Sequence, residues 1–158
     1  MTKRIFLHGL ESSSKGTKAV FFRERYPDML TPDFTGSLDE RLARLEQILE
    51  RESAIRMVGS SFGGLMGTIF AMQKESSVER LVLLAPAIHM LSTLPYPLKE
   101  VSTPVHVYHG TNDEVIPLED VRTVARRFFR NLVFQTVEDD HFLHKTFQTI
   151  DWDGFLIR

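Results

Sequence analysis

The chain has 158 residues, of which 42% are hydrophobic and 25% charged, and its formal net charge is −2. These values predict a single globular domain over residues 1–158 with a buried core, and they give no electrostatic argument for binding nucleic acid or an anionic membrane. The chain has no cysteine, which excludes disulfides, thiolate zinc sites and cysteine nucleophiles.

Strand-like and helix-like segments alternate from the N-terminus onward. Residues 4–9 are an apolar run that ends in glycine and predict a strand, and residues 17–26 are helical in character up to Pro27. Residues 28–34 favour a short strand, an interpretation that Pro32 weakens because proline cannot donate to a ladder.

The clearest helix follows Ser37. Ser37 and Glu40 have the spacing of a capping box, in which each side chain bonds the backbone N–H of the other. Leucines 38, 42, 45 and 49 recur at helical spacing and predict one apolar face. The charged residues between them are expected to face solvent; they are Asp39, Arg41, Arg44 and Glu46.

The rest of the chain continues the alternation and predicts an α/β fold. The run 62–74 has no charge before Lys74, so it predicts a helix that is buried all round. About six strands result, in a mainly parallel sheet with helices on both faces, a three-layer sandwich. The remaining strands are predicted at 54–60, 80–86, 104–110 and 131–138, and the remaining helices at 117–129 and from about His141 toward Trp152, with Leu143, Phe147 and Ile150 facing inward.

A glycine-rich stretch, Gly59-Ser60-Ser61-Phe62-Gly63, joins a predicted strand to the buried helix. It matches G-x-S-x-G, the pattern of a strained turn that holds a serine hydroxyl above the sheet. Side chains two positions either side of that serine would collide with backbone, and glycine avoids this. Ser61 is therefore the candidate nucleophile, and the alternative is a tight turn that happens to contain serine.

An acid and a histidine follow two later strands, in the chain order Ser…Asp…His. Asp113 comes after the strand at 104–110, and His141 after the strand at 131–138. In open α/β sheets ligands bind beyond the carboxyl ends of the strands, so these residues fall where chemistry is expected. A serine hydroxyl needs a base to take its proton, and a carboxylate holds the imidazole in the useful tautomer. The positions predict His141 as the base and Asp113 as the acid.

Other titratable residues near these positions have simpler interpretations. Glu114 is expected at the surface, and Asp139 and Asp140 are explained by turn formation. His144, one helical turn after His141, and His8 are expected to be structural or exposed. The histidines are not clustered at ligand spacing, so no metal site is expected.

Four stretches, "FLHG", "GSSFGG", "YHGTNDEVIP" and "DDHF", give the chain a resemblance to the α/β-hydrolase superfamily over nearly its whole length. It resembles most the small, lidless bacterial serine hydrolases and esterases, because it lacks the leading hairpin and the cap domain of larger members. The resemblance implies that the backbone N–H groups of Leu10 and Phe62 form an oxyanion hole. It also implies that no organic cofactor or metal is needed.

The segment 86–102 stands where larger relatives insert a cap. Its apolar residues could wall an acyl pocket beside Ser61 or simply cover the edge of the core; they are Met90, Leu91, Leu94 and Tyr96.

These patterns predict a serine hydrolase that cleaves small or short-chain esters. Thioesterase, amidase or peptidase activity would use the same residues, and a non-catalytic binding protein on this scaffold is the alternative outside the enzymes. The apolar run near the N-terminus is too short for a signal-peptide core, and no window has the length of a membrane span. We therefore expect a cytoplasmic protein whose partner is the small ester itself.

Overall fold

All five strands of the sheet run parallel, and they lie in the sheet in their order along the chain. The computed structural model describes residues 1–158. The parallel order of the strands confirms the expected α/β sheet and brings the carboxyl ends of all five strands to one edge. The strands are β1 (Lys3–Leu7), β2 (Ile55–Ser60), β3 (Val78–Leu84), β4 (Val105–Gly110) and β5 (Leu132–Val137).

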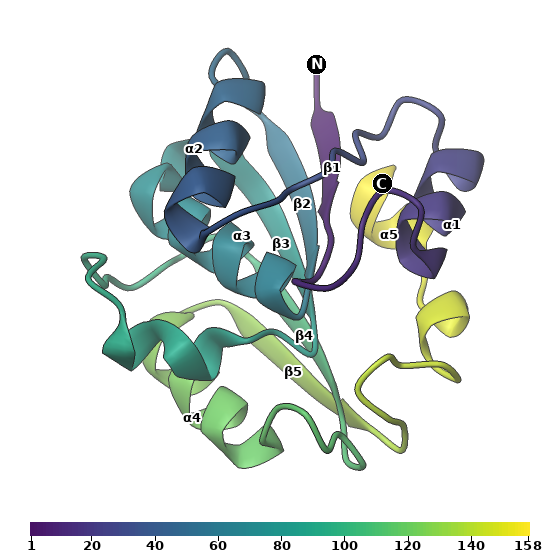
Figure 1. The fold of residues 1–158 in the computed structure, drawn as a ribbon, viewed down its shortest axis with the longest axis vertical. Coiled ribbons are helices and arrows are strands. Elements are labelled where there is room, and N and C mark those ends of the chain that lie inside the picture. Colours follow the sequence, from purple (N-terminus) through teal and green to yellow (C-terminus); the bar gives the residue numbers. More distant parts are fainter.

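Helices cover both faces of the sheet (Figure 1). The helices that directly precede or follow the inner strands, α2 (Leu38–Ile48), α3 (Phe62–Gln73) and α4 (Leu118–Phe128), lie on one face. This follows from right-handed crossovers between strands that always advance in the same direction. The helices nearest the two termini, α1 (Thr17–Arg25) and α5 (Trp152–Leu156), lie on the other face and complete the three layers. None of the helices is both long and apolar enough to cross a bilayer.

Each face of the sheet has its own hydrophobic core. The larger core lies under α2, α3 and α4 and contains Leu45, Leu65 and Val121. The smaller core lies under α1 and α5, where Phe22 packs edge-on against Trp152 at a centroid distance of 4.8 Å.

The local signals of α2 and α3 are confirmed. The Ser37 hydroxyl accepts from the Glu40 N–H, and the Glu40 carboxylate accepts from the Ser37 N–H, both at 3.2 Å. Every residue of α3 from Gly63 to Met72 is buried, as the uncharged run predicted. The helix packs on β1, β2 and β3 and is flanked by α2, so it has no solvent-facing side for a charge to occupy.

The predicted strand over residues 28–34 is reduced to a single bridge. The sheet therefore has five strands where about six were expected. Leu30 alone pairs with β1: its N–H donates to the Arg4 carbonyl, and its carbonyl accepts from the Phe6 N–H, each at 2.9 Å. Pro32 follows two residues later and has no N–H with which to continue the ladder.

The predicted helix from His141 to Trp152 is wrong, although the residues predicted to face inward are buried. The chain instead makes turns, a short 3₁₀ helix at Phe147–Thr149 and then α5. Leu143 has φ 54°, in the left-handed region, which ends any α-helix at that point. Carboxylates of Asp139 and Asp140 also take nearby backbone N–H groups that a helix would pair with carbonyls. Leu143, Phe147 and Ile150 are all buried.

Two glycines of α3 provide a test of this packing. A Cβ at Gly63 would lie 2.0 Å from the Leu7 carbonyl oxygen, whereas a Cβ at Gly67 would first meet the Met57 sulfur at 3.0 Å. Gly63→Ala forces backbone apart, and we expect it to lower the free energy of unfolding by about 3 kcal/mol. Gly67→Ala should change it by less than about 1 kcal/mol, because a methionine side chain can shift and alanine favours the helix. Urea denaturation measures both values, and equal losses would contradict this account.

Candidate active site

The candidate residues gather at the carboxyl edge of the sheet. Ser61 follows β2, Asp113 lies in the loop after β4, and His141 lies in the loop after β5. The loop after β1 reaches the same place, because a Cβ on Gly9 would be 3.5 Å from the Ser61 Cβ. Parallel topology thus assembles at one edge four segments that are far apart in the sequence.

Ser61 occupies a strained turn between β2 and α3. Its backbone has φ 54° and ψ −115°, a left-handed conformation that is rare for a residue other than glycine. The flanking glycines are required by close contact, since a Cβ on Gly59 would lie 2.5 Å from the Gly63 carbonyl oxygen. This is the geometry expected of a nucleophile elbow.

The Ser61 hydroxyl is not consumed by the turn that holds it. A serine at the N-cap of a helix usually accepts a hydrogen bond from the first-turn N–H groups. Ser61 caps α3 without such a bond, and the turn is held by its backbone, whose carbonyl accepts from the Gly64 and Ala87 N–H groups. The hydroxyl therefore remains available for chemistry.

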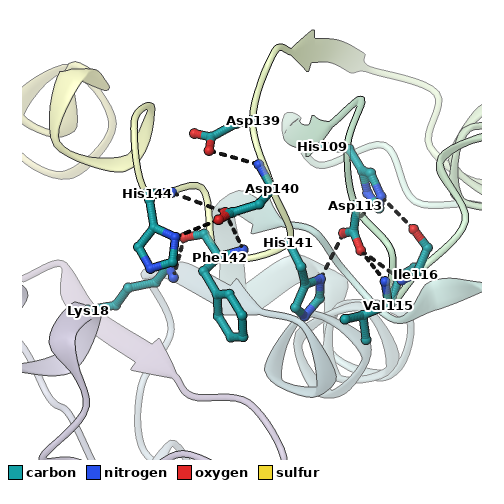
Figure 2. Close-up of polar contacts among 10 residues, drawn as sticks. All are labelled: Lys18, His109, Asp113, Val115, Ile116, Asp139, Asp140, His141, Phe142 and His144. Atoms are coloured by element: carbon teal, nitrogen blue, oxygen red, sulfur yellow. Dashed lines mark hydrogen bonds and ion pairs between the residues drawn. The ribbon is translucent and has the colours of Figure 1, made fainter.

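His141 and Asp113 are hydrogen-bonded to each other (Figure 2). The His141 Nδ1 lies 2.7 Å from Oδ2 of Asp113, whose side chain is fully buried. A carboxylate only accepts, so the proton of a neutral His141 ring is on Nδ1. The lone pair then lies on Nε2, which is the tautomer that a base needs. Nε2 makes no hydrogen bond to another protein group, and neither does the Ser61 hydroxyl, so the structure does not join Ser61 to His141 by a hydrogen bond.

The Asp113 carboxylate is fixed by three further groups. Its Oδ1 accepts from the backbone N–H groups of Val115 and Ile116, both at 2.8 Å. Its Oδ2 lies 3.2 Å from the Nε2 of His109, the next-to-last residue of β4. Glu114, the neighbouring alternative for the acid, is exposed, as expected.

His109 is a buried neighbour of this pair that no sequence pattern marks as functional. Its Nε2 faces two acceptors, the Ile116 carbonyl at 3.0 Å and Asp113, so Nε2 carries the proton. Burial lowers the pKa of His109 below its ordinary value of 6.5, and this outweighs the opposing influence of the Ile116 carbonyl and Asp113. A histidine four residues before the acid, at the end of a buried strand, was the available signal.

The loop that carries His141 is held by its own acidic residues. The buried Asp139 carboxylate accepts from the Lys145 and Thr146 N–H groups, and Asp140 accepts from the Nδ1 of the exposed His144 at 2.6 Å. Turn formation therefore explains both acids, as predicted. Gly110 permits the approach of this loop to β4, because a Cβ there would lie 2.3 Å from the Asp139 carbonyl oxygen.

A contact from α1 holds the other side of the same loop. Lys18 donates to the Phe142 carbonyl at 2.8 Å, and its ammonium lies over the Phe147 ring (Figure 2 shows Lys18 beside the loop). Burial lowers the pKa of Lys18, although Asp140 and Asp139 act against this shift. His141 is thus held between β4 on one side and α1 on the other.

The two residues expected to supply an oxyanion hole have unused backbone donors. Phe62 is the first residue of α3, so its N–H has no partner within the helix. The Leu10 N–H, in the loop after β1, donates no hydrogen bond to a backbone or side-chain acceptor. His8, next to this loop, is buried and structural: Nδ1 donates to the Gly9 carbonyl, and Nε2 accepts from the Phe34 N–H at 2.9 Å.

The predicted pocket residues differ in their surroundings. Leu91 is buried in the larger core, where it cannot touch a ligand without rearrangement. Met90, Leu94 and Tyr96 are half-buried and pack against that core, and the Tyr96 hydroxyl donates to the Asp39 carboxylate of α2. Of the four, only Met90, Leu94 and Tyr96 keep exposed surface for a ligand.

Three apolar side chains on the loops at this edge of the sheet are largely exposed. Leu10, Val115 and Phe142 are 53%, 64% and 58% exposed, and each comes from a loop that follows a different strand.

Arg41 was expected to face solvent but is buried, and the reason is its position on the helix. It lies three residues after Leu38 and four before Leu45, which puts it on the apolar face of α2. No group of three or more histidine or acidic side chains has the arrangement of a metal site.

Comparisons with known proteins agree with this fold. A family model described as the alpha/beta hydrolase fold matches residues 7–103, more than half of the chain. The chain therefore belongs to the α/β-hydrolase fold family. No curated protein sequence matches it.

Solved structures with the same architecture include proteins from bacteria and an animal. A candidate hydrolase of the α/β superfamily from Xanthomonas campestris pv. campestris is 26% identical, with 93% of this chain and 91% of that chain covered and a TM-score of 0.76. Est1E from Butyrivibrio proteoclasticus, with ferulic acid bound, is 16% identical, with 89% and 81% covered and a TM-score of 0.74. Alpha/beta hydrolase domain-containing protein 10 from mouse is 20% identical, with 88% and 81% covered and a TM-score of 0.73. Family and neighbours together support a hydrolase.

The buried His109 predicts a pH dependence of stability. Its pKa is lower in the folded chain than in the unfolded one, so the unfolded state binds more protons below about pH 6.5. The free energy of unfolding should therefore fall as the pH is lowered from about 6.5 toward the pKa that His109 has in the folded chain. His109→Gln keeps a donor near the Nε2 position but cannot titrate, and we expect a flatter decline. Urea denaturation at several pH values between 7 and 5 measures this, and parallel curves for the two proteins would contradict it.

Proposed function

We propose that this protein is a serine hydrolase that cleaves small or short-chain carboxylic esters through an acyl-enzyme. The observation that carries the proposal is the His141–Asp113 hydrogen bond of 2.7 Å, which puts the free lone pair of the imidazole on Nε2. The strained backbone of Ser61, beyond the same edge of the sheet, supports it. The proposed site is a small-molecule site in a cytoplasmic protein and involves no metal, cofactor, nucleic acid or membrane.

In the first half-reaction, Ser61 Oγ bonds to the carbonyl carbon of the ester while His141 Nε2 takes the hydroxyl proton. Asp113 stabilises the imidazolium that forms and holds its orientation. The tetrahedral intermediate collapses when the C–O bond to the alcohol breaks, and His141 gives its proton to the departing oxygen. In the second half-reaction, His141 takes a proton from water as the water oxygen bonds to the acyl carbon. The bond between that carbon and Ser61 Oγ then breaks, His141 returns the proton to Oγ, and the acid is released.

The carbonyl oxygen becomes negatively charged in both tetrahedral intermediates. The Leu10 and Phe62 N–H groups are the proposed donors to that oxyanion, because both are unused within the protein. Fixed backbone donors stabilise this charge without having to reorganise at the moment of reaction. In related enzymes the loss of one such donor costs about 3 kcal/mol of transition-state stabilisation.

The surroundings of the site favour a small substrate held on an apolar rim. Leu10, Val115 and Phe142 expose carbon surface on the loops that carry the proposed oxyanion and catalytic residues. The segment that follows β3 supplies only a short 3₁₀ helix, Ile88–Thr93, where a longer insertion would enclose a larger acyl group. Met90 lies in that helix and is the proposed contact for the acyl chain.

An activated serine can be detected without knowledge of the natural substrate. We expect a fluorophosphonate probe to label the protein stoichiometrically at Ser61, as mapped by peptide mass spectrometry. Labelling should be abolished in Ser61→Ala and reduced by at least about a hundredfold in rate in His141→Ala, since the base is lost. Ser60→Ala is the matched control and should label like the wild type. Failure of the folded wild type to label, beside an esterase that does label, would overturn the proposal.

The bond and the acyl size are tested by a substrate series. We expect kcat/KM to be higher for p-nitrophenyl acetate and butyrate than for longer chains. The reason is that the short segment after β3, with its 3₁₀ helix Ile88–Thr93, is not expected to enclose a long acyl group. Matched thioesters and amides should react more slowly than esters. Methyl ferulate belongs in the series because the Est1E structure holds ferulic acid. A preference for long chains, or for thioester or amide over ester, would replace the proposed substrate class while leaving the serine mechanism in place.

A further inference from the structure

Arg41 is a buried cation without an anionic partner. Its side chain projects from the apolar face of α2, and the residue is only 5% exposed. No aspartate or glutamate oxygen lies within 4.0 Å of its guanidinium. Burial lowers the pKa of Arg41, but a guanidinium stays protonated in proteins. A buried charge of this kind is costly unless something compensates it.

The contacts of Arg41 lead to both residues proposed to bind the oxyanion. Its Nη2 donates to the Leu10 carbonyl at 3.3 Å, and its Nε donates to the Gly36 carbonyl at 3.0 Å. The guanidinium carbon lies 5.3 Å from the centre of the Phe62 ring. Nη1 is buried and has no hydrogen-bond partner in the protein. One side chain thus connects the loop after β1 to the first residue of α3.

These contacts have an electrostatic consequence for the proposed reaction. Negative charge forms next to Leu10 and Phe62 in each tetrahedral intermediate and is absent from the substrate. A fixed positive charge in a dry environment stabilises that transient charge much more than it would in water. It therefore favours the transition state over the bound ester, which is the condition for raising kcat.

We propose that Arg41 is a positioning residue of the oxyanion site: it ties the loop that carries Leu10 to the Phe62 end of α3 and supplies positive potential where the oxyanion forms. The inference rests on the proposed serine hydrolase function. It assigns Arg41 no contact with the substrate, because the guanidinium is covered by the protein.

Four variants separate the charge from the packing. Arg41→Met removes the charge at similar length, Arg41→Gln is neutral but keeps an amide donor, and Arg41→Lys keeps the charge without the guanidinium fork. Arg44→Met removes the same charge from an exposed position of the same helix and is the matched control. Circular dichroism and thermal unfolding establish which variants are folded.

The readouts are kcat and KM for p-nitrophenyl acetate and the inhibition constant of an alkyl trifluoromethyl ketone, which forms a tetrahedral oxyanion on the serine. We expect Arg41→Met and Arg41→Gln to lower kcat by about tenfold or more, with KM nearly unchanged and ketone affinity falling in parallel. Arg41→Lys should recover a substantial part of the loss, and Arg44→Met should match the wild type.

Three results would overturn the inference. The first is a folded neutral variant with wild-type kcat and ketone affinity. The second is a loss expressed in KM alone. The third is an Arg41→Lys variant as impaired as the neutral ones, which would mean that the charge has no role. If the wild type labels at Ser61 and hydrolyses the ester, these results concern Arg41 only; if the wild type does neither, the proposed function fails and this inference fails with it.

Discussion

The backbones of β1, β2 and α3 meet so closely at the start of α3 that two glycines there have no room for a side chain. A Cβ on Gly63 would overlap the Leu7 carbonyl, and a Cβ on Gly59 would overlap the Gly63 carbonyl. This contact brings the end of β1 against the turn after β2, so the Leu10 loop and Ser61 share one corner of the sheet. The same turn forces Ser61 into a left-handed conformation and leaves its hydroxyl unused. The strain is sustained by the packing of α3, which is buried on all sides.

A second close approach, at Gly110, completes the arrangement. There the backbone of β4 meets the loop after β5, and the meeting brings His141 to Asp113. The acidic residues of that loop stabilise its turns, while a lysine from α1 holds its far side. The proposed chemistry therefore depends on loops that are individually irregular but are fixed at both ends. Such fixation is what a preorganised site requires, because groups that must reorient during the reaction lose part of their stabilising effect.

Much of this could be predicted from sequence, because the relevant signals are local. Periodicity and capping predicted α2, the uncharged run predicted α3, and the glycine spacing predicted the strained turn at Ser61. Asp113 and His141 were predictable as a pair because parallel strands bring their carboxyl ends to one edge. Two predictions were wrong, the strand at 28–34, which is a single bridge, and the helix after His141, which is a series of turns. Side-chain carboxylates and a left-handed Leu143 determine the second of these, and periodicity does not report either.

Arg41 and His109 show a different limit of sequence reading. Arg41 lies on the apolar face of α2 by spacing, yet its charge argues for solvent, and only the packing of Phe62 and the Leu10 loop shows that it is buried. His109 lies in a buried strand, and its contact with Asp113 depends on how the following loop turns back. Both residues act on others through tertiary contacts, and the chain order alone does not reveal which contacts form.

The central claim, that Ser61 becomes acylated with the help of His141, is tested most directly by trapping the covalent intermediate. A p-nitrophenyl dimethylcarbamate leaves a carbamoyl group that is slow to hydrolyse, so the modified protein accumulates. We predict release of one equivalent of p-nitrophenol and a carbamoyl group on Ser61 by peptide mass spectrometry, with neither in His141→Ala. Modification of a residue other than Ser61, or no covalent product from a protein that hydrolyses p-nitrophenyl acetate, would contradict the account.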